Sequence, residues 1–349
     1  MAAGRIAALV LASATSALAA RAQDAPRAPI PKDLVGNYVA PAEQSDQVFN
    51  RHGLRAIYQL IHRRPLLVVS WRADDPASLE HGVPAALELA QQHPDLVPVF
   101  VERSGRGFEE MLRVVCRQRW LCSDALWTCE LPAGFGVMPA PSFVLTSMGH
   151  MGVLTGDLVA DRAELEAAIG VVVGQRRLGE DDLPDEARAA WKACAEGNWK
   201  AALELRRAAG KRRARGQPGD AEAAEVLDEQ LKILDDVLMN EIQIAEAMTR
   251  SGSGAEGRRR AEGFRKQVKD LPADHRLKVT TESLLESIRH ETLFAEIEAS
   301  EELETLQDKL CRGGPSAALA NSFRKLAKEH AGTKAAERAL VYAKLVEGG

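Results

Sequence analysis

The stretch LLVVSWRADDPAS, residues 66–78, decides the fold of the N-terminal half. Its first six residues, Leu66 to Trp71, form a short apolar run that ends in an aromatic residue, which is typical of a buried strand. A polar turn follows, and Asp75-Pro76 is a good helix start, because aspartate caps the first backbone N–H groups and proline suits the first helical position. We therefore expect a buried strand that leads directly into a helix.

The flanking sequence predicts further elements of an α/β sandwich. The expected order is a helix over 45–62, the strand over 66–71, a helix over 76–92, a strand over 97–101, a helix over 107–121, an insertion over 122–134, a strand over 142–146, a hairpin return through Val153-Leu154, and a closing helix over 163–173. Gly149 suits the hairpin turn, because glycine accepts positive φ. This order indicates a parallel strand pair with an antiparallel edge.

The segment GVMPAPSFVL, residues 136–145, brings a proline to the start of the later strand. Together with the strand that ends at Trp71, it resembles the thioredoxin family, in which a cis-proline opens the corresponding strand. The resemblance covers Ser45 to Gly170 and implies a thioredoxin-like fold with Pro141 in the place of that proline. It also puts Asp75 and Ser78, give or take one residue, where the family carries its C-x-x-C cysteines.

The resemblance implies a site that has lost its chemistry. A cysteine at a helix N-terminus is activated because unpaired N–H groups and the helix dipole stabilise its thiolate. An aspartate cannot exchange disulfides, and a serine hydroxyl is far too weak an acid to substitute. We therefore predict a non-catalytic protein whose retained face binds an extended peptide or protein partner by strand addition. The residues expected at that face are Trp71, Asp75, Ser78, Ala140 and Pro141.

The cysteines leave an alternative open. The chain has five, Cys116, Cys122, Cys129, Cys194 and Cys311, so at least one is free or pairs with another chain. Cys122 and Cys129 flank a short loop and are the easiest pair to close. They could form a structural disulfide or remain plain buried thiols. Alternatively, they could form a displaced redox pair that would make the protein a divergent thiol–disulfide oxidoreductase. No helix N-terminus is evident beside either sulfur, which favours the structural interpretation.

The N-terminus predicts export. Arg5 precedes an apolar stretch, Ile6 to Leu18, that is too short to span a bilayer, and small residues then offer cleavage sites. We interpret residues 1–22 as a signal peptide, residues 23–44 as an extended Pro- and Ala-rich linker, and the mature chain as periplasmic or extracellular. No other run is long and apolar enough to predict a transmembrane helix. The net charge of −5 gives no reason to expect a polyanionic partner.

The rest of the chain reads as helix throughout. We place the thioredoxin-like domain at 45–174 and an α-helical domain at 175–349, which lacks strand signals and is rich in Ala, Leu, Glu, Lys and Arg. Residues 187–203 resemble a tetratricopeptide-type hairpin, although no second copy at a fixed period follows. Helices are expected over 220–249, 255–271, 277–298, 301–311, 316–331 and 334–346.

Other features favour structural roles. The histidines, among them His52 and His150, lack metal-site spacing and a matched carboxylate, and His150 is expected to face solvent in the hairpin turn. Trp120 and Trp127 could line a groove beside Pro141 or anchor the insertion. The basic runs 206–215 and 258–260 are interpreted as solvated helix ends and not as a nucleic-acid surface. No phosphate-binding, hydrolase or metalloprotease motif occurs, so we expect neither a cofactor nor a metal.

Overall fold

The fold is described from a computed structural model of the full chain. It describes residues 47–53, 61, 64–122, 124–130, 138–147, 149–175, 201, 210–211, 213–216 and 220–348. The predicted signal peptide, the linker and the tetratricopeptide-like motif at 187–203, apart from Ala201, lie outside these residues. Within them, no helix combines the length and apolarity that a bilayer crossing requires.

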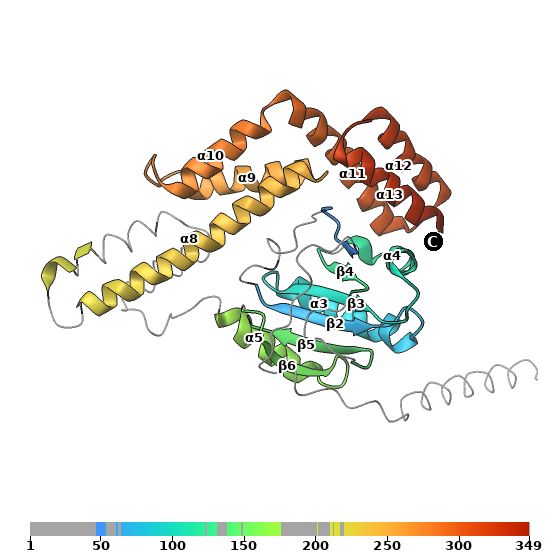
Figure 1. The fold of residues 1–349 in the computed structure, drawn as a ribbon, viewed down its shortest axis with the longest axis horizontal. Helices are drawn as coiled ribbons and strands as arrows, with labels where there is room; N and C mark the ends of the chain where they lie inside the picture. Colours follow the sequence, from blue (N-terminus) through green and yellow to red (C-terminus); the bar gives the residue numbers. More distant parts are fainter. Residues whose placement is uncertain are drawn as a thin grey trace, which may run out of the picture.

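The N-terminal half is built on one mixed sheet of six strands in the order β1-β4-β3-β2-β5-β6 (Figure 1). Its centre is β2 (Leu66–Trp71), which pairs in parallel with β3 (Val97–Glu102) and antiparallel with β5 (Ser142–Thr146). β6 (Gly152–Asp157) continues the antiparallel side. Every residue of β2, β3 and β5 is buried, as their continuous apolar runs predict. The predicted parallel pair with an antiparallel edge is confirmed.

From β2 onward, the helices of this half follow the predicted order. A π-helical turn (Ser78–Gly82) leads into α3 (Val83–Gln92), α4 (Phe108–Arg117) follows β3, and α5 (Arg162–Gln175) closes the half. A short 3₁₀ helix, η3 (Trp120–Cys122), extends α4. The apolar side chains at helical spacing, among them Met111, Leu112 and Leu165, form part of the core on the sheet.

Two predictions at the other edge of the sheet are wrong. The segment 122–134, expected as an insertion, contains β4 (Leu126–Thr128), which pairs in parallel with β3. Within the described part of 45–62, Val48–Phe49 form strand β1 and not helix, and β1 pairs antiparallel with β4. Both strands are too short to show a period, so only their long-range pairing defines them.

The β5–β6 hairpin turns at a different residue from the one expected. His150, and not Gly149, adopts positive φ at 59°. Its side chain is buried, and its Nε2 atom lies 3.0 Å from the carbonyl oxygen of Ile61. The prediction that His150 faces solvent is therefore wrong, because a hydrogen bond to a distant segment holds the ring inside.

The C-terminal half is helical over its described residues. It contains α8 (Asp220–Arg250), α9 (Gly254–Val268), α10 (Arg276–Ile288), α11 (Glu291–Gly313), α12 (Ala317–Glu329) and α13 (Lys334–Gly348). The predicted helices over 277–298 and 301–311 are divided differently: the chain breaks at Arg289-His290, and α11 runs unbroken from Glu291.

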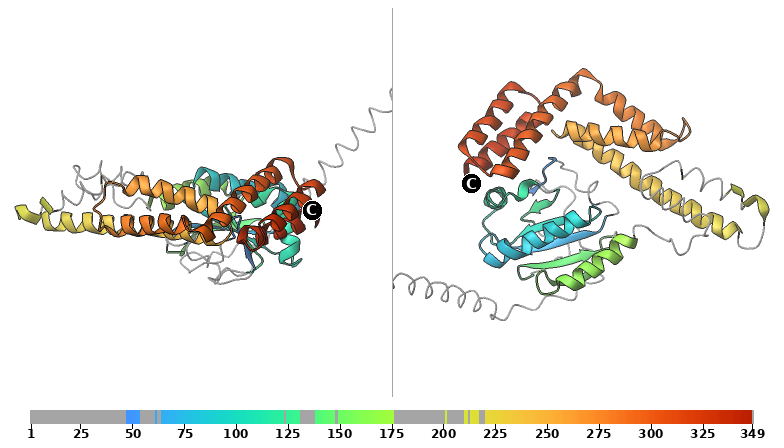
Figure 2. Two further views of the ribbon diagram at one scale, coloured as in Figure 1. Left: turned by 90° about the horizontal axis from the view of Figure 1, so that it is seen from above. Right: turned by 180° about the vertical axis from the view of Figure 1, so that it is seen from behind.

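The two halves share one core. The helical half lies beyond the β1–β4 edge of the sheet in Figure 1 and in the right-hand view of Figure 2. α13 packs against α4, and α11 packs against η3. The rings of Phe49 in β1 and Tyr342 in α13 meet edge to face at 6.0 Å, and a single cluster of buried side chains runs from β2 to α13. The helical half therefore completes the hydrophobic core of the α/β half.

Candidate functional site

The first candidate site lies where β2 ends and the next helix begins. Asp75 caps this helix: its Oδ2 atom accepts hydrogen bonds from the Ser78 backbone N–H at 2.9 Å and from the Ser78 hydroxyl at 2.7 Å. Its Oδ1 atom accepts from the Ala77 N–H at 3.3 Å. The Ser78 hydroxyl also accepts from the Arg72 N–H at 3.2 Å. The backbone donors that could stabilise a thiolate are thus bound to a carboxylate already.

Pro141 packs against the same helix. The Ala140–Pro141 peptide bond is cis. A Cβ atom placed on Gly82 would lie 2.5 Å from the Pro141 Cβ atom, which is closer than two carbons can approach without displacement. Glycine at position 82 therefore permits the helix and the start of β5 to touch, and the structure brings Asp75, Ser78 and Pro141 into one region as the sequence predicts.

Trp71 belongs to the core and not to the surface of this site. It is fully buried, and its indole lies edge to face on Trp120 and Trp127 at 5.9 Å each. Trp127 stacks in turn on Phe100 at 4.3 Å. Trp120 and Trp127 are therefore anchors and not the walls of a groove.

Burial limits which predicted residues a partner can reach. Trp71 and Ser78 have essentially no exposed surface, and Pro141 is also buried, whereas Asp75 and Ala140 are half-buried. Pro76, which follows Asp75 in the chain, is exposed. The accessible part of the candidate site therefore consists of Asp75, Pro76 and Ala140. The other predicted residues, Trp71, Ser78 and Pro141, are buried.

The carboxyl ends of the parallel strands bring Glu102 and Cys129 beside this region. Glu102 is paired with Trp71 across β2 and β3, and its Oε1 atom accepts from the backbone N–H groups of Ala73 and Ser104 at 3.0 and 2.7 Å. It thereby fixes the loop that leads to Asp75. The signal for Glu102 in the sequence is its place as a lone acid at the end of an apolar strand, and it was not predicted as a site residue.

Neither of the free thiols is activated. Burial and the neighbouring carboxylates of Glu102 and Glu130 raise the pKa of Cys129 to about 11, and burial raises the pKa of Cys116 to about 11. Both are therefore thiols and not thiolates at neutral pH. Because Cys129 carries a free thiol, a structural Cys122–Cys129 disulfide is excluded, and of the structural alternatives a plain thiol remains for Cys129.

A second candidate is a cavity of about 640 Å³ between the two halves of the protein. Among the described residues, its lining includes three arginines and three acids, namely Arg51, Arg64, Arg260, Asp95, Asp124 and Glu241. Arg64 pairs with Glu241, and Arg260 lies 3.7 Å from the same carboxylate. In the described part of the lining, Arg64, Arg260 and Glu241 therefore form one ion-pair cluster.

His52 lines this cavity and pairs with a carboxylate, so the prediction that the histidines lack one is wrong for His52. Its Nε2 atom lies 3.1 Å from Asp124 Oδ1, and its Nδ1 atom lies 3.4 Å from the Ser253 hydroxyl. Burial lowers the pKa of His52 and outweighs the opposing effect of Asp124. The two partners are 72 positions apart in the chain, so no local sequence spacing indicates the pair. Over the described residues, no cluster of His, Cys, Asp and Glu has the make-up of a metal site.

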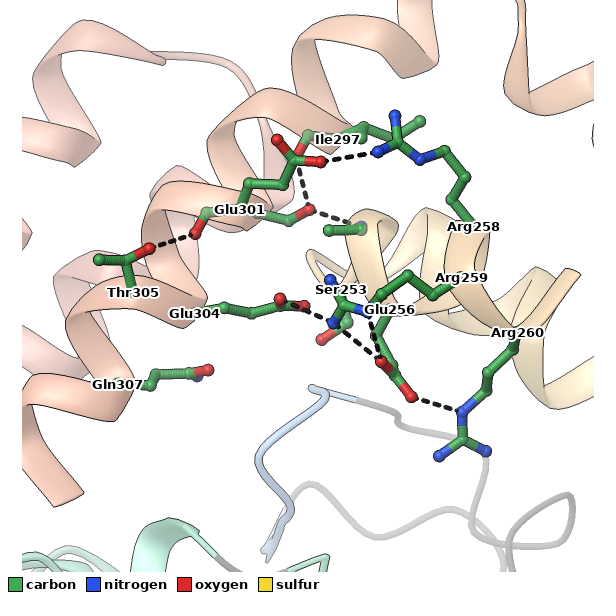
Figure 3. Close-up of polar contacts among 12 residues, drawn as sticks. Ser253, Glu256, Arg258, Arg259, Arg260, Ile297, Glu301, Glu304, Thr305 and Gln307 are labelled. Carbon is green, nitrogen blue, oxygen red and sulfur yellow. Dashed lines mark hydrogen bonds and ion pairs between the residues drawn. The ribbon is translucent and has the colours of Figure 1, made fainter. Parts of the chain in front are cut away.

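The basic run at 258–260 is neutralised within the helical half (Figure 3). Arg258 binds Glu301 at 2.9 Å, and Arg259 binds Glu256 and Glu304, both at 2.8 Å. Arg260 binds Glu256 at 2.8 Å. These residues lie in the middle of α9, so the prediction that they are solvated helix ends is wrong, and the pairing leaves no cationic surface there. In the other run, Arg213 pairs with Asp228.

Comparisons with known proteins add little. No family model matches the sequence, and no curated protein matches it. Among solved structures, the crystal structure of a thioredoxin-like superfamily protein is similar at a TM-score of 0.34 and 14% identity, over 40% of this chain and 97% of that chain. The thioredoxin-like interpretation of the N-terminal half therefore depends on its own strand order and on the placement of Asp75, Ser78 and Pro141.

Proposed function

We propose that this chain is an exported, non-catalytic thioredoxin-like protein that binds an extended peptide or protein segment at the Asp75–Ala140 face. The observation that supports the proposal is the Asp75 cap, in which Asp75 and Ser78 bond to each other and Asp75 accepts from the helix N–H groups. The resemblance assigns these two residues to the positions of the reactive thiols. This arrangement keeps the local shape of the site but offers no group that can attack a disulfide.

Burial of the supporting residues agrees with a binding role. Trp71, Glu102 and Pro141 are buried and fix the loop and the strand start, so the exposed part is rigid. A rigid surface loses less entropy on binding than a mobile one. The helical half, proposed as a tetratricopeptide-like surface for a second partner, is fixed to the sheet through the shared core.

The alternative is a thiol–disulfide oxidoreductase that uses Cys122 and Cys129. The raised pKa of Cys129 argues against it, because only the thiolate attacks a disulfide. With a pKa of about 11, on the order of one thiol in ten thousand is ionised at pH 7.

Binding is tested with a permanently unfolded polypeptide, reduced and carboxymethylated α-lactalbumin, labelled for fluorescence anisotropy. The mature protein should bind it saturably, and Ala140→Arg should weaken binding at least about tenfold by placing a long charged side chain on the site. Ala160→Arg, on the exposed turn between β6 and α5, is the matched control and should bind like the wild type. Equal affinities for the two variants would refute binding at this face.

Restoring the missing thiols tests the chemical half of the proposal. The variant Asp75→Cys with Ser78→Cys should reduce insulin with dithiothreitol as electron donor, since it frees the helix N–H groups to stabilise a thiolate. A folded double variant with no activity above the wild type would show that the site does not retain thioredoxin-like geometry.

A further inference from the structure

The oxidation state of three of the five cysteines limits which disulfide the chain can form. Cys311 in α11 is disulfide-bonded, whereas Cys116 and Cys129 are free thiols. Because the chain contains five cysteines, the partner of Cys311 within the chain is Cys122 or Cys194. The first would connect the two halves of the protein, and the second would not.

Contacts around Cys311 favour the first possibility. α11 packs against η3, the short helix that ends at Cys122. The guanidinium of Arg119, one residue before η3, donates from Nη1 to the carbonyl oxygen of Arg312 at 3.2 Å. A Cβ atom on Gly314 would lie 3.4 Å from the same guanidinium. The turn of α11 that carries Cys311 therefore lies against the segment that ends at Cys122.

We propose that Cys311 is bonded to Cys122 and that this disulfide is a redox-sensitive lock between the α/β half and the helical half. The bond would join residues that are 189 positions apart, and a cross-link across so long a loop strongly restricts the unfolded chain. It acts at the α4–η3 side of the interface.

Noncovalent contacts form a second part of the same interface, at the segment Asn50–Gly53. Arg338 in α13 donates to the carbonyl oxygens of Arg51 and Gly252, the latter at 2.6 Å. The Ser251 hydroxyl donates to the carbonyl oxygen of His52 at 2.9 Å. These contacts do not depend on the disulfide, so its reduction should loosen the interface without abolishing it.

A dithiol supplies the electrons that open the lock. One thiolate of the dithiol attacks a sulfur of the protein disulfide and releases the other cysteine, and its second thiolate then displaces the first cysteine. Two electrons and two protons pass to the protein, which gains two thiols, and the dithiol becomes a cyclic disulfide.

Peptide mapping of the oxidised full-length protein tests the connectivity. Free thiols are alkylated, the protein is digested without reductant, and mass spectrometry should find one linked peptide pair that contains Cys122 and Cys311. A linked pair that contains Cys194 and Cys311, or an alkylated Cys311, would overturn the proposal.

Thermal unfolding tests the lock itself. Reductant should lower the Tm of the wild type by roughly 5 to 10 °C, and Cys311→Ser should have the lower Tm already and no response to reductant. Cys129→Ser, which removes a free thiol, is the control and should keep the response. A Cys311→Ser protein that still responds to reductant like the wild type would refute the lock.

Discussion

Replacement of Asp75 by alanine should destabilise the protein far more than the same change at its neighbour Asp74. Asp75 accepts three hydrogen bonds from Ala77 and Ser78, and the Ser78 hydroxyl is fully buried. Loss of the cap costs about 1 kcal/mol, and a buried hydroxyl without its acceptor costs about 1 to 2 kcal/mol more. Asp75→Ala should therefore lower the free energy of unfolding by about 2 to 3 kcal/mol.

Urea denaturation, followed by far-UV circular dichroism, measures this difference. Asp74 is exposed. It pairs with the exposed Arg72 at 3.0 Å and more distantly with Arg106, so Asp74→Ala should cost less than about 0.5 kcal/mol. Equal free energies of unfolding for the two variants, within error, would show that Asp75 does not stabilise the helix as a cap.

Three further predictions test the packing and the interface. Gly82→Ala should lower the free energy of unfolding by about 1 to 3 kcal/mol, because the added Cβ atom clashes with Pro141. Gly170→Ala in α5, where the added Cβ atom meets open space, should not destabilise the protein. Denaturation midpoints compare the two variants. Arg338→Met removes three hydrogen bonds from a charged donor and should cost about 3 to 5 kcal/mol in the same assay, against little for the exposed Lys344→Met. Equal losses would show that the Arg338 hydrogen bonds do not stabilise the interface. Burial alone would raise the pKa of Asp124, but His52 and Arg51 outweigh this effect and lower the pKa to about 2. The stability that this carboxylate contributes is therefore present above about pH 4 and is lost as the pH falls towards 2. Asp124→Asn should therefore lack part of the wild type's acid destabilisation between pH 4 and 2, and superimposable pH profiles would refute this.

Local signals account for what the sequence predicts well. β2, β3 and β5 are continuous apolar runs, and Asp75 is followed by Pro76 at a helix start, so the strand, the cap and the order of elements follow from short windows. The position of Pro141 beside the helix could be predicted because the resemblance covers both segments.

Elements and side-chain positions that depend on contacts between residues far apart in the sequence could not be predicted from it. β4 has three residues, and its parallel pairing with β3 is what makes it a strand. His150 is drawn inside by a carbonyl 89 residues away, and His52 finds its carboxylate 72 residues away. Trp71 was expected at a binding surface, but the aromatic cluster with Trp120 and Trp127 buries it. Such contacts have no period or spacing in the sequence, so only the folded chain reveals them.

Insulin reduction by the mature wild-type protein, with dithiothreitol as electron donor, tests most directly whether this fold has lost exchange chemistry. We predict a rate no higher than that of dithiothreitol alone, unchanged in Cys122→Ser and Cys129→Ser variants. Turnover by the wild type that disappears in either variant would show that another sulfur has replaced the missing thiols, and it would contradict the non-catalytic account.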